Sequence, residues 1–241
     1  MNLELAGKHV VVTGASKGIG LAIAKAFTAE GAHLTLVARR DEVLAKEAGV
    51  LADQSGVTVD YMALDLSQDT ERVALFDAYG RADILVNNAG AIKNGPINAR
   101  SLDEWREGFD LKFWGYVHLC QLYVEAMRAR KSGTIINIIG MGGRAVRPSY
   151  IIGAAGNAAL IGFTNALGAA TPADDVRVFG INPSLTLTDR MMDRLKERAQ
   201  RELGDAAQWE SLMDPDTFPF GRPKMPEEVA ALAVMLASPH V

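Results

Sequence analysis

The sequence has few of the features that mark secreted, metal-binding or membrane-spanning proteins. It contains one cysteine, Cys120, so a disulfide framework within the chain is excluded and a cysteine-based metal site is not expected. Cys120 lies in the apolar stretch Val117–Leu122, which predicts a small buried side chain. We therefore expect no metal centre.

Long hydrophobic runs and charge runs are also missing. No apolar run is expected to reach the ~18 residues that a spanning helix needs. Met1–Gly7 carries Glu4 and lacks the basic start of a signal peptide. The net charge of −4, without a long run of one sign, argues against a nucleic-acid partner. We expect a cytoplasmic protein that acts on a small molecule, with no membrane and no nucleic acid as partner.

Short apolar segments alternate with helical patterns along the whole chain. With 241 residues, of which 49% are hydrophobic, the chain can bury one sizeable core. Strands that are apolar throughout are buried on both faces, which is typical of a parallel sheet covered by helices. The fold class is therefore predicted as α/β, a doubly wound parallel sheet (Rossmann fold) with three layers in a single domain, 1–241. Strands are predicted at His9–Val12, His33–Ala38, Val57–Ala63, Ile84–Asn87, Thr134–Ile139 and Val176–Ile181, and helices at Ile19–Glu30, Asp41–Gln54, Ser67–Ala78, Leu102–Arg130 and Ala154–Ala169.

The segment Thr186–Pro223 interrupts this alternation. It is charged, looks mobile and carries scattered large apolar residues, among them Met191 and Trp209. Long excursions of this kind are usually lids over a site or poorly ordered loops. We predict a lid at about 186–223, with a surface excursion that has no role at the site as the alternative.

A glycine-rich turn follows the first predicted strand. The run Thr13-Gly14-Ala15-Ser16-Lys17-Gly18-Ile19-Gly20 stands between that strand and a helix. Glycines allow the tight turn and let backbone N–H groups approach a pyrophosphate, and the helix directs its positive end toward the phosphates. The pattern predicts a dinucleotide held by Gly14, Ser16, Lys17, Gly18, Ile19 and Gly20.

Taken with its other motifs, the chain resembles the classical short-chain dehydrogenase/reductase family. Asn87-Asn88-Ala89-Gly90 and Asp65-Leu66 match two of that family's signatures after strands, and Asn182-Pro183 with Thr188 resembles a third. The resemblance implies a homodimer or homotetramer through Leu102–Arg130 and Ala154–Ala169. The resemblance also implies a seventh strand. This strand would either come after Val241 or be missing from the sheet. The further cofactor-binding residues that it implies are Asp65, Leu66, Asn88, Ala89, Gly90, Asn157, Pro183 and Thr188.

The end of the second predicted strand indicates the cofactor. An acidic residue there would bind the ribose hydroxyls of NAD(H), whereas this chain has Arg39 and Arg40. Arginine suits a phosphate, and Lys17 adds positive charge nearby. NADP(H) is therefore favoured over NAD(H). The acidic residue Asp41 follows directly after Arg40 and would instead favour NAD(H).

The family's usual catalytic tetrad of Asn, Ser, Tyr and Lys is not found at the matching positions. These positions hold Lys112, Gly140, Gly153 and Asn157 in that order, so the resemblance implies an atypical member. Tyr150 is the one tyrosine nearby, and the residue four places after it is Ala154. No shift of register therefore restores Tyr-x-x-x-Lys.

Two hypotheses follow for the catalytic residues. Lys112 and Asn157 look like an exchange of the family's Asn and Lys, which would leave an amine near the nicotinamide ribose, where desolvation lowers its pKa. Lys112 pointing to solvent, or pairing with Asp110, is the alternative. The phenol of Tyr150 could enter the space that the glycines leave and act as an acid, or it could be a packing residue at a helix start. Further polar candidates, of which the two arginines could bind an anionic substrate, are Asn137, Arg144 and Arg147.

Three functions remain open on the sequence. The first is an NADP(H)-dependent oxidoreductase with a non-standard acid–base site, acting on an apolar carbonyl or alcohol compound. The second is a non-redox isomerase or lyase in the same pocket. The third is an NADP(H)-binding sensor or partner protein without catalysis, because a fold does not by itself decide a function.

Overall fold

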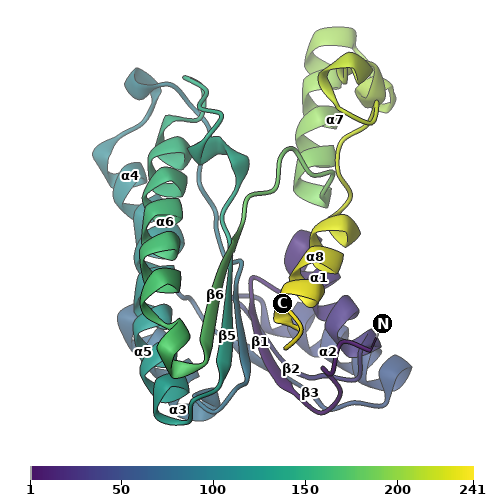
Figure 1. Ribbon diagram of the computed structural model, residues 1–241. Coiled ribbons are helices and arrows are strands. Elements are labelled where there is room, and N and C mark those ends of the chain that lie inside the picture. Colours follow the sequence, from purple (N-terminus) through teal and green to yellow (C-terminus); the bar gives the residue numbers. More distant parts are fainter. Residues whose placement is uncertain (1) are drawn as a thin grey trace.

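A six-stranded parallel sheet runs through the middle of the molecule (Figure 1). The structure is a computed structural model that describes residues 2–241. The strand order is β3-β2-β1-β4-β5-β6, so the order reverses between β1 and β4, as in a doubly wound sheet. The predicted fold class is confirmed. The strands are β1 (His9–Thr13), β2 (His33–Ala38), β3 (Val59–Ala63), β4 (Ile84–Asn87), β5 (Gly133–Ile138) and β6 (Val176–Ile181).

The central strands are apolar on both faces because each face meets its own core. On β1, Val10 and Val12 pack into one hydrophobic cluster, and Val11 packs into the other. The strand predicted from Val57 begins at Val59, and β3 is largely exposed because it lies at an edge of the sheet. The strand predicted at Thr134–Ile139 lies one residue earlier.

Helices cover both faces of the sheet and make the three layers (Figure 1). The helices α1 (Gly18–Ala29), α2 (Asp41–Ser55) and α8 (Pro226–Ala237) lie on one face. The helices of the other face are α3 (Asp69–Tyr79), α4 (Leu102–Phe109), α5 (Gly115–Ala129) and α6 (Ile151–Ala170).

The helix predicted at Leu102–Arg130 is interrupted. It begins as expected, because the Ser101 hydroxyl accepts the Glu104 N–H at 3.2 Å and the Glu104 carboxylate accepts the Ser101 N–H at 3.1 Å. A π-helical turn at Asp110–Trp114 then separates α4 from α5. Within this turn Lys112 is only 8% exposed, whereas Trp114 is 52% exposed. Such turns are frequent at functional sites.

Helix α6 begins three residues before the predicted start. Its 20 residues are long and apolar enough to cross a membrane, by length and composition alone, so the expectation that no such run exists is wrong. The helix packs against the sheet, with Leu160 buried beside Tyr116 and Ile139. Because a core helix of this kind passes the same test, one such helix is weak evidence for a membrane span.

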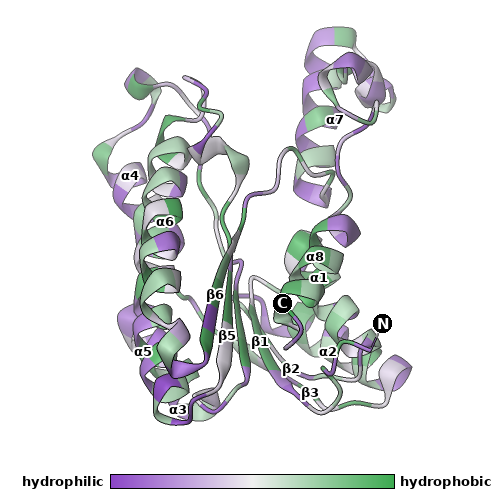
Figure 2. Cartoon of the chain, viewed as in Figure 1, coloured by the Kyte–Doolittle hydropathy of each residue, from purple (hydrophilic) through white to green (hydrophobic). Residues whose placement is uncertain are grey.

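The excursion after β6 contains a regular helix that the sequence analysis did not predict. It holds helix α7 (Asp189–Leu203), which stands away from the rest of the molecule and is mostly polar (Figures 1 and 2). Leu195 and Ala199 bury one stripe of α7, and Gly204 ends the helix at φ 77°. The base of the excursion is closed by two hydrogen bonds, Leu187 N–H to Lys224 O at 2.7 Å and Lys224 N–H to Leu185 O at 3.1 Å.

Candidate active site

The glycine loop after β1 is packed against the end of β4. A Cβ on Gly14 would lie 2.9 Å from Ala89 Cα, and Gly14 has a φ of 67°, so both space and conformation require glycine. A Cβ on Gly20 would lie 2.3 Å from the carbonyl oxygen of Gly14. Gly20 thus supports the loop from beneath and does not line the cavity, which corrects its predicted contact with the cofactor.

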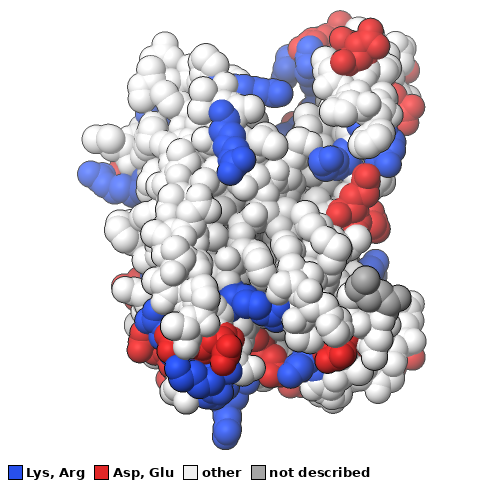
Figure 3. Space-filling view, in the orientation of Figure 1, with Lys and Arg blue, Asp and Glu red and all other residues white. Residues whose placement is uncertain are grey.

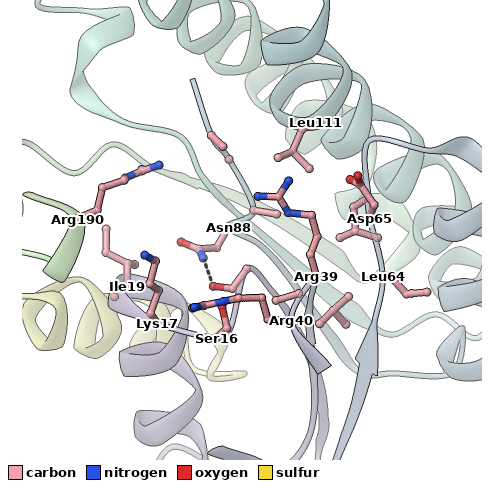
Figure 4. Close-up of a pocket in the computed structure, with 18 of the residues that line it drawn as sticks. Ser16, Lys17, Ile19, Arg39, Arg40, Leu64, Asp65, Asn88, Leu111 and Arg190 are labelled. Atoms are coloured by element: carbon pink, nitrogen blue, oxygen red, sulfur yellow. Dashed lines mark hydrogen bonds between the residues drawn. The ribbon is translucent and has the colours of Figure 1, made fainter. Parts of the chain in front are cut away.

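Hydrogen bonds tie this loop to the Asn-Asn-Ala-Gly segment. The Thr13 hydroxyl accepts the N–H groups of Asn88 at 2.9 Å and Ala89 at 3.1 Å, and it donates to Val86 O at 3.3 Å. The Asn88 amide donates to Thr13 O at 3.0 Å and to Gly14 O at 3.3 Å, and Figure 4 draws the second of these bonds. These bonds fix the place where the strand order reverses, which is where α/β sheets bind nucleotides.

A cavity of about 330 Å³ opens above this seam. Figure 4 shows side chains entering it from the glycine loop, from the end of β2 and from the end of β3. Asp41, the first residue of α2, is exposed and does not line this cavity. Its carboxylate therefore does not oppose a phosphate on the adenine ribose of the cofactor. Of the predicted cofactor residues, those that line this cavity are Gly14, Ser16, Lys17, Gly18, Ile19, Arg39, Arg40, Asp65, Leu66, Asn88, Ala89, Gly90 and Thr188.

A second cavity of about 450 Å³ adjoins the first. The two share five lining residues, so a ligand in one can reach a ligand in the other. The shared residues are Ile19, Asn88, Gly90, Thr188 and Arg190. The predicted residues that line only the second cavity are Lys112, Gly140, Arg147, Tyr150, Asn157 and Pro183.

Lys112 reaches the second cavity from the π-helical turn. Its ammonium donates to Ile138 O at 2.7 Å and to the Tyr116 hydroxyl at 2.9 Å, and its stem lies against Gly90. Asp110 is exposed, and in the described part of the chain no carboxylate pairs with Lys112, so both alternatives for this residue are wrong. Burial, and secondarily the charge of Arg190, lower the pKa of Lys112 to about 7.

Asn157 lies on α6 and is 2% exposed. Its Oδ1 is buried without a hydrogen-bond partner in the structure, which is costly unless a ligand supplies a donor. Its Nδ2 would lie 3.0 Å from a Cβ on Gly140. Lys112 and Asn157 thus share a cavity, but among the described residues no hydrogen bond joins them directly. The free acceptor and the glycine cradle fit a dinucleotide that spans the two cavities.

The ring of Tyr150 fills the place that a side chain at position 153 would take. A Cβ on Gly153 would lie 1.9 Å from Cζ of Tyr150, so residue 153 must be glycine while the ring is there. Tyr150 stands at the start of α6 and lines the second cavity. Burial raises the pKa of Tyr150, while the charges of Arg190 and Arg194 oppose that rise. Tyr150 therefore serves both as a packing residue and as a cavity residue.

The remaining candidates divide between core and cavity. Asn137 is fully buried and bridges Asn87, at 3.0 Å, and Thr164, at 3.0 Å, so it is a structural residue. Arg144 is exposed and lines neither cavity, whereas Arg147 lines the second. Tyr116, Arg190 and Arg194 are among the polar residues of the site that sequence reasoning missed.

A spacing of four residues could have revealed them. Tyr116 follows Lys112 by four positions, and Arg194 follows Arg190 by four, so each pair lies on one face of its helix. The beginning of the excursion, up to Arg194, contributes to the second cavity. Its closing as a lid remains a prediction.

The comparisons with known proteins agree with this geometry. The family described as short chain dehydrogenase matches residues 8–199. The chain belongs to this family. Members of the short-chain dehydrogenase family are NAD(P)-dependent oxidoreductases, and this is the class of the chain.

Relatives match over nearly their full length. The 3-oxoacyl-(acyl-carrier-protein) reductase of Chlamydia muridarum is 32% identical over 99% of this chain and 93% of its own. The crystal structure of L-sorbose reductase from Gluconobacter frateurii with NADPH and L-sorbose is 34% identical, with a TM-score of 0.93, and covers 99% of this chain and 92% of its own. A 3-oxoacyl-(acyl-carrier-protein) reductase from Agrobacterium tumefaciens C58 with NADP bound is 29% identical, with a TM-score of 0.88, and covers 98% and 89%.

Exchanging Gly153 for alanine should reveal the contact with Tyr150. In the wild-type background, Gly153→Ala is expected to lower the free energy of unfolding by about 1–3 kcal/mol, because its Cβ meets the phenol ring. In a Tyr150→Ala background the same exchange should stabilise by up to about 1 kcal/mol, since alanine is the better helix former. Urea unfolding of the four proteins measures both effects. The same sign in both backgrounds would contradict the contact.

Burial of Lys112 should make stability depend on pH. The pKa of Lys112 is about 7 in the folded chain, whereas its usual value is 10.5. Between these two pH values the amine is protonated in the unfolded chain and mostly neutral in the folded chain. Folding is then favoured as the pH rises through that window. Relative to Lys112→Met, the wild type should gain about 3 kcal/mol in unfolding free energy from pH 6 to pH 9. Equal differences between the two proteins at both pH values would argue against a buried titrating amine.

Proposed function

We propose that this chain is an NADP(H)-dependent oxidoreductase of a carbonyl or alcohol compound, with an acid–base site that differs from the usual tetrad of its family. Lys112, Gly140, Gly153 and Asn157 take the four positions. The observation that carries the proposal is the phenol ring of Tyr150. It lies in the space left by Gly153, in a cavity that adjoins the nucleotide cavity.

The choice of NADP(H) is supported by charge at the adenine-ribose end. Arg39, Arg40 and Lys17 line the cavity, and none of them forms an ion pair among the residues that the structure describes. In Figure 4, Arg40 extends toward Ser16 and Lys17. A phosphate on the ribose would give these cations a partner of matching charge. Two similar solved structures contain NADPH or NADP.

The chemistry is divided between the cofactor and the chain. When bound, NADPH would supply a hydride to the carbonyl carbon. Tyr150 donates a proton to the carbonyl oxygen, because a phenol is protonated at neutral pH; burial raises its pKa, and the charges of Arg190 and Arg194 oppose that rise. Lys112, with a pKa of about 7, is partly protonated there and favours negative charge in the cavity. The free Oδ1 of Asn157 would accept a hydrogen bond from a ribose hydroxyl of the bound cofactor.

We also propose assembly of like chains through α5 and α6. Ala155, Ala158 and Ala159 of α6 are exposed, and small residues allow close helix packing. Ala154 was expected among them, but it is buried within the chain. A homodimer or homotetramer would cover this exposed apolar face.

Parallel titrations test the cofactor. The dissociation constant for NADPH is expected to be at least about tenfold below that for NADH, at one fixed salt concentration. Arg39→Gln and Arg40→Gln should each weaken NADPH by about tenfold and leave NADH unchanged, because they remove charge-assisted hydrogen bonds to a phosphate. Lys25→Gln, an exposed change on α1, is the control. Equal affinities for the two nucleotides would reject the phosphate site, and binding of neither would reject the oxidoreductase.

Turnover tests the acid–base residues. With NADPH and a carbonyl panel, Tyr150→Phe should lower kcat by about 10²–10⁴-fold with little change in NADPH affinity, because only the proton donor is lost. Lys112→Met should abolish any transition near pH 7 in kcat/KM. Unchanged turnover in Tyr150→Phe would exclude the acid role. Substrate conversion without NADPH consumption would favour an isomerase or lyase, and NADPH binding without chemistry would favour a sensor.

A further inference from the structure

The second cavity has an unusual charge balance. Four of its lining residues are cationic, and its lining includes no Asp or Glu among the residues that the structure describes. The whole chain contains 29 acidic and 25 basic residues, so its composition does not account for this excess. The four cations are Lys112, Arg147, Arg190 and Arg194.

The three arginines of this cavity are not neutralised within the described chain. None of them forms an ion pair there, whereas Arg198 on the same helix is held by Glu202 at 2.9 Å. Arg100 is likewise held by Glu104, and Arg222 by Glu228. Unpaired guanidinium groups at the wall of a cavity are available to an anionic ligand, which they bind through charge-assisted hydrogen bonds.

The cations reach the cavity from different elements. Arg190 and Arg194 lie on one face of α7, and Arg147 comes from the loop before α6. Figure 3 shows basic side chains around the hollow between the α6 side and α7, while acidic side chains lie mainly at the outer end of the excursion and at the base. Arg190 and Arg194 line the same cavity as Tyr150, the proposed proton donor, and their charges oppose the rise of its pKa.

The bound cofactor would not account for all of these cations. Arg190 lines both cavities and can face the cofactor, but Arg147 and Arg194 line only the second. The phosphates of a dinucleotide would lie in the first cavity, and the nicotinamide ribose that enters the second carries no negative charge, so the cofactor leaves Arg147 and Arg194 without an anionic partner.

We infer that the substrate of this site is anionic: a carbonyl or alcohol compound with a carboxylate or phosphate group that Arg147 and Arg194 bind. Its remaining part lies against the apolar wall, which includes Ile92, Ile139 and Met191. This substrate class replaces the expectation of a purely apolar molecule. The assignment to a carbonyl or alcohol rests on the proposed function, whereas the anion site rests on the cavity alone.

Lys112 couples anion binding to protons. A bound anion favours the charged amine, so it raises the pKa of Lys112 from about 7 and draws a proton from solution. Affinity for the anion should accordingly increase as the pH falls from 8 toward 6 in the wild type. In Lys112→Met this pH dependence should be largely lost.

The test compares matched probes on protein saturated with NADP⁺. Benzoylformate is paired with its methyl ester, and dihydroxyacetone phosphate with dihydroxyacetone, so each pair differs in the anionic group. Calorimetry is expected to show at least one anion binding about tenfold or more tightly than its neutral partner. Benzoylformate would indicate a carboxylate substrate, and dihydroxyacetone phosphate a phosphorylated one. If neither anion binds more tightly than its partner, the inference is wrong.

Variants locate the site. Arg194→Gln and Arg147→Gln should each weaken the preferred anion by about tenfold and leave the neutral probe and NADPH unchanged. Arg144→Gln, from the same loop as Arg147, and Arg198→Gln, from the same helix as Arg194, line neither cavity and should change nothing. Equal weakening by the control variants would show general surface attraction and overturn the site.

The outcomes also separate this inference from the proposed function. If NADPH reduces neutral carbonyls and no anion is preferred, the oxidoreductase stands and the anion site fails. If anions bind through Arg147 and Arg194 but no probe is reduced and NADPH does not bind, the anion site stands and the proposed function fails.

Discussion

The seam between Thr13 and Asn88 is the contact on which the rest of the site depends. It joins the loop after β1 to the end of β4, where the strand order of the sheet reverses. The backbones approach so closely that only glycine fits at positions 14 and 20. Both cavities open above this seam and share Asn88, so a change there would move nucleotide and substrate together.

The strands and their layers were predictable because burial on both faces leaves uninterrupted apolar runs. The π-helical turn at Asp110–Trp114 was not, since its residues have no local pattern that separates it from an α-helix. Helix α7 was missed for a different reason. Its residues are strongly polar, and only Leu195 and Ala199 mark a buried stripe. The spacing of Met191, Leu195 and Ala199 is helical, but the many charged residues around this stripe led us to interpret the segment as an excursion.

At the site, the alignment of motifs identified four positions, Lys112, Gly140, Gly153 and Asn157. It did not predict how these residues are buried or which residues they contact. The burial of Lys112 depends on the π-helical turn, and the contact of Tyr150 with Gly153 depends on a side-chain rotamer. The hypothesis of an exchanged pair holds only in part: Lys112 and Asn157 share a cavity, while Lys112 donates to Ile138 O instead.

The surroundings of Tyr150 have a consequence for the acidity of its phenol. Burial raises the pKa of Tyr150, and the opposing charges come from Arg190 and Arg194 on α7. An anion bound by these arginines would screen them and raise the pKa of the phenol further, which makes Tyr150 a weaker acid and leaves it protonated as before. Under the proposed mechanism, the helix that binds the charge of the substrate therefore also tunes the acidity of the proton donor.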